Sequence, residues 1–362
     1  MTEENIEKKK FQFDIFKLYN TVPGGIIIVP LFTFAIINTL FPDLLTTLGG
    51  MTGGLFKTGT LAFTGICMFA SGATLNVKQL GTIFRRFGPL LIVKLGVGML
   101  LGFVFVKAFG LGGALGINAI AFVTVACSAN PGIFLGICSS NGDKEDLGGF
   151  PFIAIASMQA WPILIVGLGS GGVDWFAFLS VLIPFFLGLF FGQFDKTVGK
   201  LMNGVVPIVT PFLGACFGSA IDLKAALSAG IPGVILGVVM FILFALILIP
   251  VDRKIGKRPG YAACGWCTVA GSSLAVPMLM TGEMYQPYAA AALSQIAIAL
   301  LIMAILCPIL TKIVVNKWGD GKVVEPVEAP DEEAQIDAPA ETSAEAPAEA
   351  QIEAPAKDKE EA

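Results

Sequence analysis

The residues that could do chemistry lie where an apolar stretch is interrupted. Residues 122–140 read FVTVACSANPGIFLGICSS, with the tripeptide Asn130-Pro131-Gly132 near the centre. Proline removes a backbone donor and clashes with the preceding turn, and glycine has no preference for helix. We therefore predict that a helix breaks across 129–132 and that the freed backbone carbonyls face a polar site.

A second interruption lies in the apolar stretch YAACGWCTVAGSSLAVPMLM at 261–280. Its centre, residues 270–273, corresponds to 128–131 when the two halves of the chain are compared. Two broken helices that cross would direct half-helix ends and unwound carbonyls into one cavity, which suits an anionic solute and a coupling cation. The residues that we assign to substrate binding here are Ser128, Asn130, Ser272 and Ser273. The alternative is that Asn-Pro-Gly is only a kink, repaired by neighbouring helices.

Lys94 is a charged residue inside the apolar run LLIVKLGVGMLLGF. On insertion scales a cation at that depth costs about 3 kcal/mol, so the side chain should face protein, water or an anion. We interpret Lys94 as a counter-charge for a substrate carboxylate. In the alternative, its long stem carries the ammonium to the membrane surface near Arg85 and Arg86.

Five further polar residues are candidates for the same site. Asn76 and Asp222 end two apolar stretches, and we assign them to substrate binding, with helix capping as the alternative. Gln159, Gln295 and Glu283 are candidates for the coupling ion. Hydrogen bonding between helices is the alternative for the two glutamines, and surface exposure is the alternative for the glutamate.

The elements that must position these residues are membrane-spanning helices. The chain of 362 residues is 55% hydrophobic and 14% charged, with a mean hydropathy of +0.80, far from the balance of a soluble domain. Its apolar runs lack the alternation of strands, which predicts an all-α membrane protein and excludes a barrel. The ten predicted spans are 23–41, 58–77, 88–108, 115–139, 150–169, 175–194, 204–222, 229–250, 260–281 and 287–314.

The two halves of the chain resemble each other at a constant offset of 146 residues. The pattern G-x-x-x-N-x-K at 72–78 matches G-x-x-x-D-x-K at 218–224. Because five spans is an odd number, the second half must be inverted in the membrane. We predict a first five-helix repeat over 23–170 and a second, inverted repeat over 171–315.

The distribution of charge predicts the orientation and the character of the two ends. With ten spans both ends lie on one side, and a cytoplasmic position puts 17 Lys and Arg residues inside and three outside. The expected location is the cell (inner) membrane. Residues 1–22 are predicted to form an amphipathic segment at its cytoplasmic surface. Residues 320–362 carry a net charge of −11 and are rich in Ala, Pro and Glu, so we expect a disordered cytoplasmic tail.

Other classes of protein fit the sequence less well. The chain has no histidine, and its seven cysteines lie within apolar segments, so we expect neither a metal site nor a cofactor. No nucleophile paired with a base is visible, which argues against an intramembrane enzyme. A passive channel would need a continuous polar pore, whereas the polar residues cluster at mid-span. The expected partners are a small organic anion and the lipid bilayer, with no nucleic acid, and a homodimer is left open.

Several segments in combination resemble the bacterial 2-keto-3-deoxygluconate permease family. They are TVPGGIIIVPLF at 21–32, the NGDKEDLGGF loop at 141–150, GSAIDL at 218–223, Lys94 in its apolar helix, and the second broken span leading into Glu283-Met284. The resemblance implies a proton-coupled secondary transporter that imports a sugar-acid monoanion. It also implies a distant relation to the bile acid sodium symporter fold, with a panel domain (spans 1, 2, 6 and 7) and a core domain of crossed helices.

The chain departs from that family pattern at two places. The resemblance implies an aspartate shortly before Asn130 and a glutamate near the middle of the fifth span, where this chain has Cys127-Ser128 and Gln159. The site is then left with neutral oxygens, which could equally hold Na⁺. We therefore expect proton-coupled symport of 2-keto-3-deoxygluconate or a related sugar acid, with a Na⁺-coupled symporter of another small organic anion as the alternative.

Overall fold

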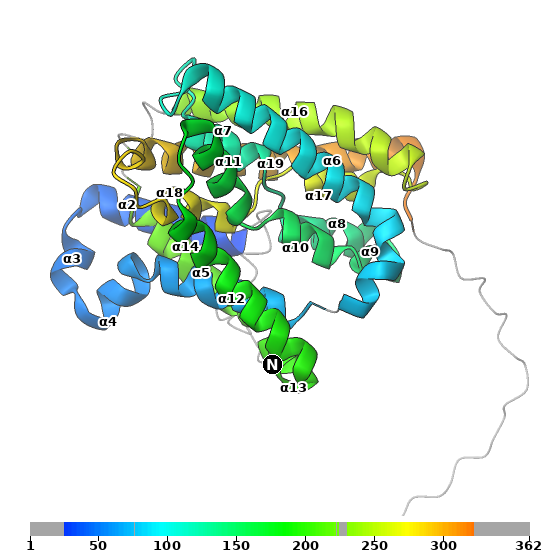
Figure 1. The fold of residues 1–362 in the computed structure, drawn as a ribbon, viewed down its shortest axis with the longest axis horizontal. Coiled ribbons are helices and arrows are strands. Elements are labelled where there is room, and N and C mark those ends of the chain that lie inside the picture. Colours follow the sequence, from blue (N-terminus) through cyan, green and yellow to red (C-terminus); the bar gives the residue numbers. More distant parts are fainter. Residues whose placement is uncertain (1–24, 76, 222, 224–229, 322–362) are drawn as a thin grey trace, which may run out of the picture. The chain divides into compact units, whose positions relative to one another are not determined.

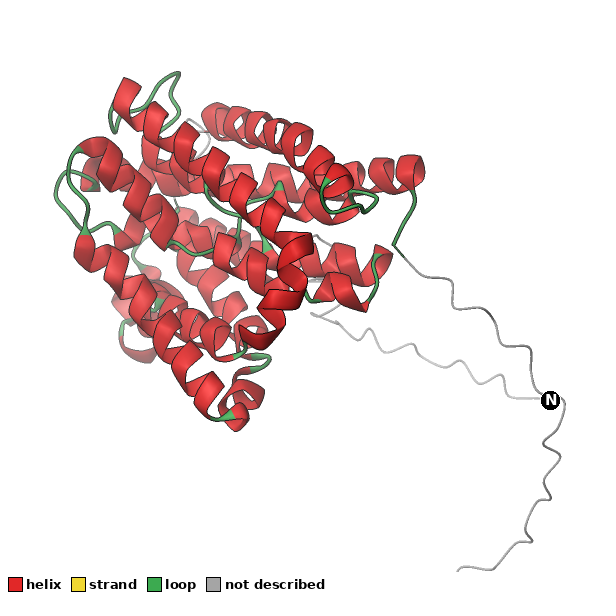
Figure 2. Cartoon of the chain, turned by 45° about the vertical axis from the view of Figure 1, so that its right-hand side comes forward, coloured by secondary structure: helices red, strands yellow, loops and turns green. Residues whose placement is uncertain are grey.

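The chain folds into a bundle of helices (Figures 1 and 2). The computed structural model describes residues 25–75, 77–221, 223 and 230–321, and over these residues it contains no strand, only one isolated bridge between Ala114 and Ile117. The prediction of an all-α protein is therefore confirmed for this part of the chain. The predicted segment 1–22, most of the predicted tail, Asn76 and Asp222 lie outside the described residues.

The helices follow one another with short connections. Their bounds are α2 (Gly25–Leu40), α3 (Leu44–Leu48), α4 (Gly50–Gly53), the π-helix η1 (Gly54–Thr58), α5 (Thr60–Ala73), α6 (Val77–Phe109), α7 (Ala119–Ala126), α8 (Pro131–Asn141), α9 (Lys144–Leu147), α10 (Phe150–Ala156), α11 (Ala160–Ser170), α12 (Trp175–Phe194), α13 (Lys196–Met202), α14 (Val205–Gly218), α16 (Gly230–Lys254), α17 (Tyr261–Trp266), the 3₁₀-helix η2 (Gly271–Ala275), α18 (Val276–Leu279) and α19 (Gln286–Trp318).

Seven helical segments are long and apolar enough to cross a membrane. They are Ile83–Phe109, Ala119–Asn141, Glu145–Ser170, Trp175–Phe194, Gly230–Lys254, Tyr261–Leu279 and Gln286–Trp318. The pair α13 and α14 passes the same test together but is bent by 42°. Two further apolar helices, Ile26–Leu40 and Thr60–Ala73, are shorter. Each of the ten predicted spans overlaps one of these segments, and the chain is a multi-pass membrane protein.

Glycines bring two pairs of helices into backbone contact. The first pair is α5 with α12, where a Cβ on Gly72 would overlap the carbonyl oxygen of Phe185. The second pair is α2 with α14, where a Cβ on Gly218 would overlap the carbonyl oxygen of Leu31. Small residues allow such close approach, and close packing drives association where the surroundings are as apolar as the helices. Gly72 and Gly218 are the two glycines that the sequence comparison aligned.

The remaining long helices pack around the interrupted ones. The long helices α6 and α16 pack against each other, and α16 also packs along α19 (Figure 1). The short helices α7 and α11 both pack on α6, where Phe105 and Phe122 stack with ring centroids 3.9 Å apart. The half-helices α8 and α17 pack so closely that a Cβ on Gly265 would lie 2.7 Å from the Cα of Phe134. The broken segments are thus enclosed by continuous helices.

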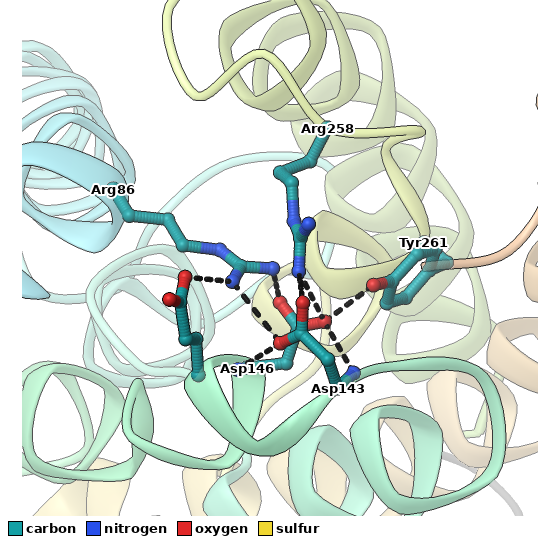
Figure 3. A network of polar contacts seen from close by, with 6 residues as sticks. Arg86, Asp143, Asp146, Arg258 and Tyr261 are labelled. Carbon is teal, nitrogen blue, oxygen red and sulfur yellow. Dashed lines mark hydrogen bonds and ion pairs between the residues drawn. The ribbon is translucent and has the colours of Figure 1, made fainter. Parts of the chain in front are cut away.

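An ion-pair network connects α6, α9 and the start of α17 (Figure 3). Arg86 on α6 and Arg258 before α17 both pair with Asp143, the N-cap of α9, and with Asp146, the third residue of α9. The Arg86–Asp143 distance is 3.4 Å and the Arg258–Asp146 distance is 3.1 Å. The hydroxyl of Tyr261, the first residue of α17, donates to Asp146. The loop 141–150 that carried the family resemblance is therefore the centre of a structural network.

The two aspartates of this network also hold each other in place. The N–H of Asp146 donates to Asp143 Oδ1 at 2.9 Å and the N–H of Asp143 donates to Asp146 Oδ2 at 3.0 Å, which forms a capping box at α9. Burial acts to raise the pKa of Asp143, but its hydrogen bond to Arg258 and the charges of Arg258 and Arg86 hold that pKa below its ordinary value. The carboxylate of Asp143 therefore stays ionised through the neutral pH range.

A Gly72→Ala substitution should destabilise the packing of α5 on α12. The added methyl group overlaps a backbone oxygen that cannot move aside, and overpacking of this kind typically costs about 1 to 3 kcal/mol. Gly65→Ala is the matched control, because Gly65 lies on the same helix and a Cβ there would meet no atom within 4 Å. Thermal melting of the detergent-solubilised protein should show a lower midpoint for Gly72→Ala alone. Equal midpoints would contradict the backbone contact.

An Arg86→Met substitution should destabilise the protein strongly. Asp146 is 0% exposed, and removing one partner of a buried ion pair typically costs about 3 to 5 kcal/mol because a charge is left uncompensated. The control is Arg85→Met, since Arg85 is the exposed neighbour and forms no ion pair with the described residues. The melting midpoint should fall far more for Arg86→Met than for Arg85→Met, and a similar small effect of both would rule out a stabilising network.

Candidate functional site

The two interrupted helices meet at their breaks. The Oγ atoms of Ser128 and Ser273 share a hydrogen bond of 2.6 Å, and Ser128 Oγ also accepts the N–H of Ala270 at 3.1 Å. The amide nitrogen of Asn130 donates to the carbonyl oxygen of Val269 at 3.1 Å. Each break thus satisfies some of the polar groups freed in the other, and we call this contact the crossing.

The first break is a complete helix start rather than a kink. Asn130 is the N-cap of α8, and its Oδ1 accepts the N–H groups of Gly132 at 3.0 Å and Ile133 at 3.1 Å. Pro131 occupies the first helical position, where its missing N–H costs nothing and its φ suits the helix. The sequence Asn-Pro-Gly therefore ends one half-helix and begins another, as its residue types predict.

The second break has a helix start without a side-chain cap. The half-helix α17 ends at Trp266, and the backbone is extended at Ala270 before η2 begins at Gly271. No side chain caps η2, and the first N–H groups of such a helix have no partner within it. The hydroxyl of Ser272 also makes no hydrogen bond to the described residues, so the start of η2 offers free donors.

A third interruption, which sequence reasoning missed, brings Gln159 to the crossing. The helix α10 ends at Ala156 and α11 begins at Ala160, with Gln159 as its N-cap. The side chain of Gln159 donates to the carbonyl oxygen of Ser272 at 3.0 Å. Its Oε1 is buried and accepts no hydrogen bond from the part of the chain that the structure describes. Gln159 therefore presents an unused acceptor beside the second break.

The crossing has two sides that differ in exposure. On the side where α8 and η2 begin, Gly132 is exposed, and Asn130, Gly271 and Ser272 are half-buried. A Cβ on Gly271 would lie 2.6 Å from the Cδ1 of Ile27, so this side faces α2. On the side where α7 and α17 end, the residues are fully buried. A solute can therefore approach only the side where the helices begin.

Lys94 lies on the buried side of the crossing. Its side chain is 0% exposed, and its Nζ lies 3.4 Å from the ring centroid of Phe244 on α16. Within electrostatic range of its ammonium are the thiols of Cys127 and Cys267, the residues that follow the last turns of α7 and α17. One turn further along α6, a Cβ on Gly98 would overlap the carbonyl oxygen of Ala126. Complete burial excludes the alternative in which the ammonium reaches the membrane surface.

Two other candidate residues make no hydrogen bond to the crossing in the described part of the chain. Gln295 uses both its polar atoms to hold the start of α7, accepting the N–H of Asn118 at 2.9 Å and donating to the carbonyl oxygen of Gly116 at 2.8 Å. This matches the alternative of hydrogen bonding between elements. Glu283 is exposed beyond the end of α18, which matches the alternative of a surface residue. The assignment of both residues to the coupling ion stays a prediction.

The comparisons with known proteins agree with the resemblance seen in the sequence. Residues 16–320 match the family model described as 2-keto-3-deoxygluconate permease. A protein named 2-keto-3-deoxygluconate permease in Bacillus subtilis (strain 168) is 32% identical over 310 residues, covering 83% of this chain and 92% of that protein. One of the same name in Enterobacter sp. (strain 638) is 30% identical over 309 residues, covering 83% of this chain and 92% of that protein.

A more distant relative of the same name, in Xanthomonas oryzae pv. oryzae (strain MAFF 311018), is 29% identical over 301 residues, covering 80% of this chain and 93% of that protein. The matched region contains the crossing, Lys94 and the ion-pair network. Because the family model spans most of the chain and the relatives are named as permeases, the protein is a transporter rather than an enzyme. The chain belongs to the 2-keto-3-deoxygluconate permease family.

Proposed function

We propose that this protein imports 2-keto-3-deoxygluconate, or a closely related sugar acid, across the cell (inner) membrane by alternating access. The observation that carries the proposal is the crossing, where two broken helices supply polar groups inside an otherwise apolar bundle. Discontinuous helices of this kind form substrate sites in secondary transporters. The names of the relatives indicate the substrate class.

The proposed architecture has ten spans in two inverted repeats of five, with both termini in the cytoplasm. The helices α2, α5, α12 and α14 would form the panel, and the broken helices with α6, α16 and α19 would form the core. The aligned glycines Gly72 and Gly218 support this arrangement, because each brings a helix of one half against a helix of the other. The excess of positive charge on the loops of one side supports the orientation.

The substrate carboxylate would bind on the open side of the crossing. There the uncapped start of η2 and the hydroxyl of Ser272 supply donors, and the positive end of the α8 dipole favours an anion. The unused Oε1 of Gln159 would accept a hydrogen bond from a hydroxyl group of the sugar acid. Rocking of the core against the panel would then expose this side first to one face of the membrane and then to the other.

We propose a proton rather than Na⁺ as the coupling ion. A Na⁺ site needs several free oxygens, whereas the hydroxyls of Ser128 and Ser273 are bonded to each other. Na⁺-coupled transport of a different small organic anion is the alternative, and the transport assay described next distinguishes the two.

The test is counterflow and uptake in proteoliposomes that contain the purified protein. Labelled 2-keto-3-deoxygluconate should exchange against the unlabelled compound and should accumulate when the outside is more acidic than the inside. A panel of other sugar acids and small organic anions, tested in separate pH and Na⁺ gradients, supplies the controls. Failure to transport any sugar acid in any gradient would refute the proposed function.

The double variant Asn130→Ala with Ser272→Ala should abolish coupled uptake. The first substitution removes the cap of α8 and the hydrogen bond to Val269, and the second removes the hydroxyl at the start of η2. Ser272→Ala alone should raise KM while the melting midpoint stays close to that of the wild type, because this hydroxyl supports no other described residue. Ser294→Ala is the control, because Ser294 is a half-buried serine on α19 whose hydroxyl bonds only to its own helix. Normal accumulation by the double variant would exclude the crossing as the substrate site.

A further inference from the structure

We infer that Lys94 is the proton-carrying group of the transport cycle, and that its ammonium occupies the place of a coupling cation on the buried side of the crossing. The inference rests on the proposed function, since it names the group that couples the substrate anion to the proton. It assigns to Lys94 a role different from direct contact with the substrate carboxylate.

The position of Lys94 is one that attracts a cation. The half-helices α7 and α17 both end at the crossing, and their C-caps are Cys127 and Cys267. The C-terminal end of a helix carries a partial negative charge and unpaired carbonyl oxygens. The ammonium of Lys94 lies within electrostatic range of both caps, and its Nζ lies over the electron-rich face of Phe244. A tethered ammonium therefore occupies the place where a free metal cation would bind in a Na⁺-coupled protein.

No carboxylate compensates Lys94 within the described residues. Its Nζ is buried and has no hydrogen-bond partner there. The titratable groups that face it are the thiols of Cys127 and Cys267. Among the elements that pack on α6, the helices α7, α10 and α11 carry no charged side chain.

The other charged and titratable groups near this helix are distant from Lys94. On α17 the remaining ones are Cys264 and, at its outer end, Tyr261, while α16 carries Asp252, Arg253 and Lys254 at its last turn. Asp252 is eight residues beyond Phe244, which is about 12 Å along a helix. On its own helix, Arg86 is eight residues away and already pairs with Asp143 and Asp146. Lys94 is thus the only basic side chain at the crossing in the described part of the chain.

The charge of Lys94 should therefore depend on whether a substrate anion is bound. Burying an ammonium away from water without a compensating anion costs free energy. An anion bound on the other side of the same crossing lowers that cost. The lone pair of the neutral amine takes up a proton when the open side of the crossing faces the acidic side of the membrane. The N–H bond breaks again after the anion leaves on the other side, and the proton enters that solution. One anion and one proton cross together, with no net charge moved.

A Lys94→Arg substitution tests this cycle directly. Arginine keeps the positive charge but does not release its proton in proteins, so the empty carrier cannot return in the neutral form. We expect Lys94→Arg to lose accumulation driven by a pH gradient at least tenfold while retaining measurable counterflow, which needs no proton release. Lys107→Met is the matched control, since Lys107 is an exposed lysine on the same helix. Uptake by the wild type should not respond to an imposed membrane potential.

A second measurement needs no variant and uses the purified wild-type protein. Calorimetric titration with 2-keto-3-deoxygluconate in buffers of different ionisation enthalpy gives the number of protons taken up on binding, which should be about one near neutral pH. Binding without proton uptake, accumulation driven only by Na⁺, or full pH-driven accumulation by Lys94→Arg would each overturn the inference while leaving sugar-acid transport intact. Absence of any transport by the wild type would overturn the proposed function and this inference together.

Discussion

A broken helix inside a membrane must find partners for its unpaired backbone groups, and the structure depends on how this chain meets that requirement. Two breaks from distant parts of the chain satisfy each other. The side-chain amide of Asn130 donates to the carbonyl oxygen of Val269, and the hydroxyl oxygen of Ser128 accepts the N–H of Ala270. Either break alone would leave polar groups unpaired in hydrocarbon, at a cost of several kcal/mol for each group. The two breaks are therefore stable only as a pair.

The same arrangement places the positive ends of the half-helices on one side of the crossing and the negative ends on the other. All four half-helix ends meet at the crossing, but the two that begin there are accessible and the two that end there are buried. An anion can approach the positive ends, while the ammonium of Lys94 lies within electrostatic range of the negative ends. A single contact between two broken helices thus provides one place for an anion and another for a cation. Under the proposed function, this separation would be the physical basis for coupling them.

The elements around the crossing fix the relative positions of its half-helices. Arg86, Arg258 and Tyr261 hold the loop before α10 and the start of α17 through two aspartates, so the outer ends of α8 and α17 are fixed relative to each other (Figure 3). The helices α2 and α5 pack on α14 and α12 through glycines, with few side chains between them. Both groups of helices thus contain close backbone packing at glycines, and the first group also has the ion-pair network.

The sequence by itself determined the helical class, the positions of the apolar segments and the two central breaks. These follow from local causes, namely hydrophobic runs and the backbone restrictions of Asn130-Pro131-Gly132. The sequence could not determine which partner each polar side chain contacts. A glutamine reads the same in the sequence whether its side chain faces a ligand or a neighbouring helix. Only the tertiary structure separated Gln159, which meets Ser272, from Gln295, which holds the start of α7. Likewise, only the packing of α6 against α7, α16 and α17 decided that Lys94 lies buried at two helix ends rather than at the membrane surface.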